Sequence, residues 1–158
     1  MALVEFVIPP DQASYSVTDG KEVVSTQLDG GAARYRRDIL GATSRVSVQW
    51  TCGPSAYKYI RSFYRGVTVS GSKAFNIGLI LDEPEITTHK VYFVPGSMVL
   101  RQQQGLTYIV GAELEVYPAE VSANALEYVN LYNQFGDNWR YDEERFNTLV
   151  NFDWPGAL

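Results

Sequence analysis

The chain has 158 residues, of which 46% are hydrophobic and 20% are charged, and its net charge is −5. These values are typical of one globular domain with a buried core, and they exclude wholesale disorder. The negative net charge disfavours general nucleic-acid binding, because phosphate contacts need an excess of lysine and arginine. The single cysteine excludes an internal disulfide, and with a single histidine it disfavours a structural zinc site.

The charges are unevenly distributed. Residues 1–81 hold nine Lys/Arg and six Asp/Glu, a balance of +3, whereas residues 82–158 hold four and twelve, a balance of −8. Two interpretations remain open: a solvated surface, or a basic face that meets the acidic face of a neighbouring copy. No apolar run approaches the roughly 18 residues of a membrane-spanning helix, and the start M-A-L-V-E-F lacks signal-peptide features, so we expect no membrane insertion.

Alternation of apolar and polar residues predicts strands through most of the first 117 residues, with the period of antiparallel strands that have one solvated face. The alternation is clearest where Val46, Val48 and Trp50 share one face. The stretch Q-Q-Q-G at 102–105 is expected to be a loop. In chain order, the predicted strands are 3–8, 22–27, 45–51, 74–81, 90–94 and 106–117.

One helix is predicted at about 54–65. Pro54 suits its first turn, where the missing N–H is not needed, and Gly66 is a suitable stop. Residues on opposite faces recur at helical spacing, apolar at Ala56, Ile60 and Phe63 and basic at Lys58, Arg61 and Arg65. We therefore expect residues 1–120 to form a mainly β domain, a β-sandwich or split β-barrel of antiparallel strands with one flanking helix.

Two segments exceed what a minimal domain needs. Residues 28–44 form a long Gly- and Arg-rich connection, and unstructured connections of this length are usually functional or disordered. Residues 121–158 are predicted to form a C-terminal helix followed by an extended arm. The arm is rich in aromatic residues, unlike disordered tails, so we expect it to dock either on its own domain or on another surface.

The stretch W-T-C-G-P-S at 50–55 has the outline of a thioredoxin-type redox site, in which a helix N-terminus lowers the pKa of a cysteine. Ser55, however, stands where a second cysteine would be. The preceding strand alternates instead of being uniformly apolar, and no β-α-β unit precedes it. We therefore expect Cys52 to be a small, half-buried residue at the end of a strand.

Other enzyme signatures are also missing from the sequence. The sequence has no G-x-S-x-G serine for which His89 could act as the general base, and its glycines form no phosphate-binding loop. Asp82, Glu83 and Glu85 fall in one turn, which is typical of a solvated hairpin end. We expect a chain that is not an enzyme and has no catalytic residue, cofactor or metal site.

The order of the predicted strands and helix resembles that of a known protein family. A first strand is followed by the loop L-D-G-G-A-A-R-Y-R-R-D, the strand V-S-V-Q-W, a short helix, F-N-I-G-L-I-L, V-Y-F-V and the long strand Y-I-V-G-A-E-L-E-V-Y-P. Over residues 20–118 this order resembles the small minor tail proteins of long-tailed bacteriophages, of the distal-tail and tail-tube type.

The resemblance implies a split β-barrel with a flanking helix, and a structural role in the virion tail after synthesis in the host cytoplasm. It also implies assembly into a homo-oligomeric ring, commonly a hexamer, in contact with other tail proteins and with DNA only as cargo passing through the channel. The loop at 28–44 would reach a neighbouring subunit through Arg34, Arg36 and Arg37.

The C-terminal arm departs from the family pattern, and clasping an adjacent ring would explain it. Its candidate contact residues are Trp139, Tyr141, Phe152 and Trp154. An alternative function is a tail collar or a decoration that binds a receptor or a glycan. That alternative would use the aromatic tail and exposed tyrosines.

Overall fold

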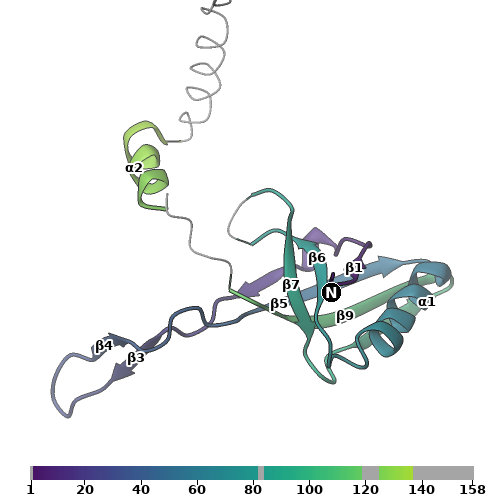
Figure 1. Ribbon diagram of the computed structural model, residues 1–158, viewed down its shortest axis with the longest axis horizontal. Coiled ribbons are helices and arrows are strands. Elements are labelled where there is room, and N and C mark those ends of the chain that lie inside the picture. Colours follow the sequence, from purple (N-terminus) through teal and green to yellow (C-terminus); the bar gives the residue numbers. More distant parts are fainter. Residues whose placement is uncertain (1, 82–83, 119–124, 137–158) are drawn as a thin grey trace, which may run out of the picture. The chain divides into compact units, whose positions relative to one another are not determined.

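The computed structural model describes residues 2–81, 84–118 and 125–136 (Figure 1). The chain divides into two compact units, residues 1–119 and 120–158. The first unit contains the strands and one helix, and the second contains another helix. Each unit is described by itself.

The first unit is mainly β with one flanking helix, which confirms the predicted fold class. Its larger sheet has seven strands, and their antiparallel pairing is broken by one parallel pair, β1 with β6. The strand order is β1 (Glu5–Phe6), β6 (Phe75–Leu79), β7 (Thr87–Phe93), β9 (Thr107–Val116), β5 (Ser44–Cys52) and β2 (Ser16–Thr18), with β8 (Val99–Gln104) also paired to β9.

Strand β9 organises this sheet because it pairs along both edges. On one edge β5 runs beside it from the pair Ser44–Val116 to the pair Cys52–Tyr108. The other edge is divided between two strands. There β7 pairs with the Val116 end, and β8 pairs with the Thr107 end.

The segment that follows β1 connects β1, at one end of the strand order, to β5, which is next to the strand at the other end. The indole Nε1 of Trp50 donates a hydrogen bond to the Ile8 carbonyl at 3.2 Å, and the Asp11 backbone N–H donates to the Gln49 carbonyl at 2.7 Å. The sheet therefore curls, so that the chain after β1 meets β5.

The core lies inside this curl and follows the predicted alternation. Val46, Val48 and Trp50 are all at most 1% exposed. Phe6 packs among them, with its ring centroid 5.4 Å from that of Trp50 and 4.9 Å from that of Phe63. Burying each such side chain contributes on the order of 1.5–3 kcal/mol to stability. The buried apolar residues on the other strands are Phe75, Ile77, Leu79, Val91, Phe93, Val110, Ala112, Leu114 and Val116.

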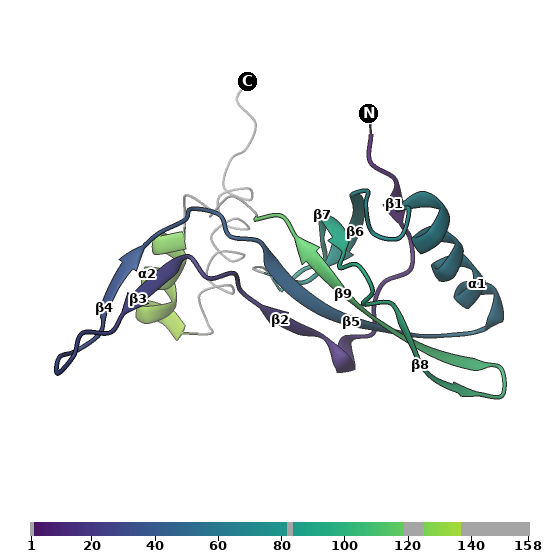
Figure 2. The ribbon, with the colours of Figure 1, turned by 90° about the horizontal axis from the view of Figure 1, so that it is seen from below.

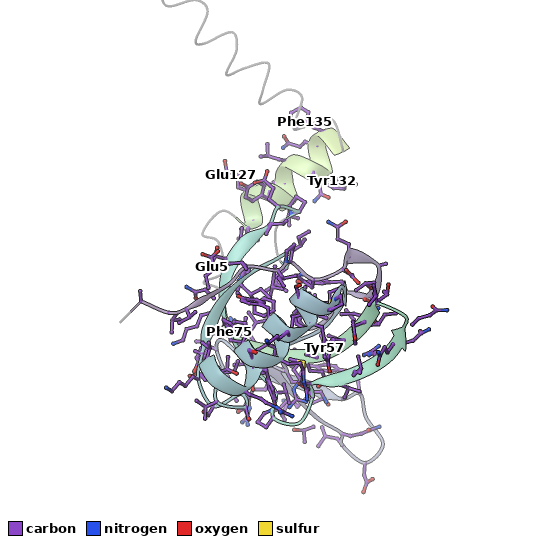
Figure 3. All side chains as sticks on the ribbon, turned by 90° about the vertical axis from the view of Figure 1, so that its right-hand side faces the viewer. Glu5, Tyr57, Phe75, Glu127, Tyr132 and Phe135 are labelled. Carbon is purple, nitrogen blue, oxygen red and sulfur yellow. The ribbon has the colours of Figure 1, made fainter. Side chains whose placement is uncertain are left out.

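Helix α1 (Pro54–Ser62) covers part of this core. Gly53 precedes it in an extended conformation and Pro54 lies in the first turn, as predicted. Ile60 is buried, and the ring of Tyr57, labelled in Figure 3, stacks on that of Tyr108 with centroids 4.6 Å apart. The helix continues as a π-helical turn, η2 (Phe63–Val67), so the helical segment passes through Gly66 instead of stopping there.

A left-handed turn returns the chain from η2 towards β6. Val69, Ser70 and Gly71 have φ angles of +49°, +56° and +98°. Left-handed backbone is unfavourable for residues with a Cβ, and most of all for a β-branched one. Backbone hydrogen bonds hold the turn, among them Ser70 N–H to the Tyr64 carbonyl at 2.9 Å.

The structure corrects several predicted boundaries. The connection at 28–44 contains β4 (Arg34–Arg37), which pairs with β3 (Val23–Thr26) in a separate two-stranded sheet. Gln102–Gln104 belong to β8 and not to a loop. All residues of β4 and β8 are exposed, so these two strands show no apolar alternation. The first strand is shorter than 3–8, and β2 was not predicted because it has three residues.

The second unit contains α2 (Ala125–Phe135), which confirms the predicted C-terminal helix. Tyr132 and Phe135 project from it and are 53% and 47% exposed (Figure 3). Trp139, Tyr141, Phe152 and Trp154, the predicted contacts of the C-terminal arm, lie outside the described residues.

Candidate functional site

The most distinctive surface is the hairpin of β3 and β4, which we call the ribbon (residues 23–37). It extends away from the seven-stranded sheet in both views of the chain (Figures 1 and 2). All eight residues of its two strands are exposed. An isolated two-stranded hairpin is at best marginally stable in water, so an exposed ribbon gains most from contact with another surface.

One carboxylate anchors the base of the ribbon. Glu22 accepts hydrogen bonds from Arg37 Nη2 and from the Gly41 backbone N–H, both at 3.0 Å. Its own carbonyl accepts from the Asp38 backbone N–H at 2.8 Å. The hydrogen bond from Arg37, and then that from the Gly41 amide, holds the pKa of Glu22 below its ordinary value. Glu22 therefore joins the start of the ribbon to its end.

The segments that lead into and out of the ribbon, residues 20–22 and 38–43, which we call its stems, approach each other closely beside this anchor. A Cβ added to Gly20 would lie 2.5 Å from the Thr43 carbonyl oxygen, a distance that real Cβ atoms do not show. Glycine is thus required where the chain enters the ribbon. The ribbon leaves the sheet on a narrow base.

The register separates the three arginines predicted as contacts. Residues opposite each other in an antiparallel pair share a face, and the pairs are Val23–Arg37, Val24–Arg36, Ser25–Tyr35 and Thr26–Arg34. Arg34 and Arg36 therefore share a face with Val24, whereas Arg37 lies on the face of Tyr35. Arg37 pairs with Glu22, and neither Arg34 nor Arg36 forms an ion pair within the part of the chain that is described.

Large apolar side chains are also exposed on the ribbon and its stems. Tyr35 is 76% exposed, and Leu40, in the stem after β4, is 77% exposed. Tyrosine and arginine are enriched at the centres of protein interfaces, and grouped exposed apolar residues mark interaction sites. The ribbon therefore has the chemistry of a protein-binding surface.

Cys52 is the last residue of β5 and is half-buried, which confirms the prediction for this residue. Its pKa is raised, first by burial and then by the negative charge of Asp11. The Asp11 carboxylate is held nearby by a hydrogen bond from Thr51 Oγ1 at 2.6 Å. A reactive cysteine needs a lowered pKa, so this environment acts against a nucleophilic thiolate.

His89 lies within β7, where its Nε2 is 2.7 Å from Thr87 Oγ1. Within the described residues, no group of three or more His, Cys, Asp or Glu side chains is arranged to hold a metal ion. The described helices also include none with the length and apolar character to span a membrane.

Sequence reasoning missed a cavity of about 210 Å³ in the first unit. It lies between the segment after β1 and the end of β6, so its walls come from distant parts of the sequence. Pro9 and Pro10 directly follow the strand predicted at 3–8, but nothing in the sequence indicated what these prolines would face. The lining residues are Pro9, Pro10, Gln12, Tyr15, Gly78, Leu79, Ile80 and Ile86.

Comparisons with known proteins identify no family for this chain. No protein-family model matches the sequence, and a search of curated proteins finds no significant match. The fold and the ribbon are therefore the features of this chain that indicate its function.

Proposed function

We propose that this chain is a structural subunit that assembles with copies of itself into a ring, of the kind found at the tip or along the tube of a long-tailed bacteriophage tail. The observation that carries the proposal is the ribbon, an ordered hairpin that exposes every residue of both strands. Its arginines and Tyr35 are residue types favoured in interfaces.

A ribbon of this kind favours head-to-tail contacts. It extends from one place on the subunit (Figures 1 and 2), so it can reach a different surface of a neighbouring copy. Contacts between two different patches are heterologous, and they generate closed rings when the rotation between subunits closes. A single contact type is then sufficient to build the whole assembly.

The charge distribution supports the same proposal. Strand β4 carries three arginines, two of them on one face, while the sequence of residues 82–158 has a charge balance of −8. Opposite charges on different surfaces attract neighbouring copies and help to orient them. The order of the elements resembles that of bacteriophage minor tail proteins. We therefore also propose that the ring is part of a virion tail and surrounds passing DNA.

The mass of the full-length chain in solution tests the proposal. We expect light scattering and negative-stain microscopy to show rings or stacked rings. A chain that stays monomeric at every concentration would refute self-assembly. A monomer or trimer that binds glycans would support the alternative of a receptor-binding decoration.

A matched pair of variants tests the role of the ribbon. Leu40 and Leu106 are almost equally exposed, at 77% and 75%, but only Leu40 lies in the stem of the ribbon. We expect Leu40→Ser to weaken assembly and Leu106→Ser to leave it unchanged, with both variants keeping their melting temperature. Equal effects of the two substitutions would show that general surface hydrophobicity, not the ribbon, drives association.

A further inference from the structure

The cavity beside Pro9 and Pro10 has the size and walls of a site for an aromatic ring. Its volume is about 210 Å³, and most of its lining is apolar, with the amide of Gln12 among the polar groups. An apolar cavity of roughly 150 Å³ is known to hold benzene, so this one has room for a phenol ring. Ile86 contributes to the lining and is 63% exposed, so a partner can reach the cavity from outside.

The ribbon carries a ring suited to this cavity. Tyr35 is 76% exposed, and therefore it does not occupy the cavity of its own chain. A tyrosine loses little side-chain entropy on docking and has a polar end for a hydrogen bond, for which Gln12 is available. A buried aromatic anchor in a pocket is the usual energetic centre of a protein interface.

The charges around the two surfaces are complementary. Tyr35 stands between Arg34 and Arg36 on β4. Asp11 follows the proline pair directly, and Glu85 directly precedes Ile86. Arg34 and Arg36 lie on the face opposite Tyr35, so this attraction does not act through direct ion pairs and weakens as salt is added.

We propose that the Tyr35 ring of one copy docks in the Pro9–Pro10 cavity of the next copy. This inference rests on the proposed self-assembly and names the contact that produces it. Each copy gives one ribbon and receives one, so the contact is head-to-tail. It requires nothing from the C-terminal arm.

Two variants that each destroy one half of the contact provide the test. Tyr35→Ala removes the ring but keeps the cavity, and Ile86→Arg obstructs the cavity but keeps the ring. Both positions are largely exposed, so both variants are expected to fold, with circular dichroism and melting temperature as the check. Each variant alone should lose assembly. An equimolar mixture should form a dimer of the two different variants and nothing larger, because only one productive contact remains.

Trapping the contact with cysteines provides a second measurement. In a Cys52→Ser background the chain has no native thiol. Chains with Ser25→Cys, which keep Tyr35 and place the thiol beside it on the same face of the ribbon, and chains with Ile86→Cys, mixed under mild oxidation, should form a disulfide-linked dimer. The control replaces Ser25→Cys by Val24→Cys, on the opposite face of the ribbon, and should cross-link several-fold more slowly.

The outcomes separate this inference from the proposed function. Rings that persist in Tyr35→Ala and in Ile86→Arg, or cross-linking no faster than in the Val24→Cys control, would overturn the Tyr35 contact but leave self-assembly intact. A mixture of the two variants that stays monomeric would also overturn the contact. A native chain that never assembles would refute both.

Discussion

Arg37 Nη2 lies 3.0 Å from Glu22 Oε2, and this ion pair joins the end of β4 to the residue that directly precedes β3. Both side chains are substantially exposed, and exposed pairs contribute little to overall stability. The pair acts locally, because the same carboxylate accepts the Gly41 N–H.

The anchor should be sensitive to acid. The pKa of Glu22 is lowered in the folded chain, so its stabilising effect is complete above the unfolded value of about 4.3 and is lost as the pH falls through the folded value. We expect the Gly41 amide proton to titrate in NMR spectra with a midpoint below that of an ordinary glutamate. Glu22→Gln should abolish the titration, and a midpoint at or above 4.3 would contradict the anchor.

Gly71→Ala should destabilise the first unit. Gly71 has a φ of +98°, and a Cβ there would lie 2.6 Å from the Phe93 carbonyl oxygen. The backbone cost alone is about 1–2 kcal/mol, and the clash adds to it. Gly66 is the matched control, because a Cβ there meets nothing within 4 Å, and Gly66→Ala should change the free energy of unfolding by less than about 1 kcal/mol. Urea unfolding measures both, and equal effects would disprove the special role of Gly71.

Phe6→Ala should cost about 3–5 kcal/mol of unfolding free energy, although β1 has only two residues. The ring is 3% exposed and contacts the rings of Trp50 and Phe63, so its removal leaves a cavity in the core. Val7, next in the chain, is 70% exposed, and Val7→Ala should cost less than about 0.5 kcal/mol. Thermal unfolding compares the two, and a small loss for Phe6→Ala would mean that the N-terminal segment is not part of the cooperative core.

Cys52 should react slowly with alkylating reagents. Burial and the charge of Asp11 raise its pKa, so little thiolate is present at neutral pH. Asp11→Asn removes the negative charge, lowers that pKa and should accelerate alkylation near pH 8. Unfolding the native chain in urea gives the reference rate for an unperturbed thiol. Alkylation of the folded native chain faster than this reference would contradict the structural role of Cys52.

Sequence patterns predicted the parts of the fold that have one buried face. Val46, Val48 and Trp50 alternate with polar residues because their strand lies between core and solvent. Pro54 and the apolar stripe that includes Ile60 located α1 for the same reason. Where a strand has no buried face, as in β4 and β8, burial imposes no pattern and the strand was missed.

The candidate site was predictable only in part. The arginines of 28–44 stood out by composition, but the register of the ribbon decides that Arg37 pairs with Glu22 and that Arg34 and Arg36 lie on the other face. The cavity depends on the parallel pairing of β1 with β6, which joins residues about seventy positions apart. Such long-range contacts leave no trace in local sequence patterns.

The pairing of β9 along both of its edges has a consequence for how the molecule unfolds. Because β5 pairs along one edge of β9, and β7 and β8 pair with the two ends of the other edge, β9 leaves the sheet only when the pairs on both edges separate. Its amides should therefore exchange with solvent only through global unfolding, whereas those of the ribbon exchange through local fluctuations. The ribbon can thus change its shape to fit a surface while the sheet that carries it stays closed.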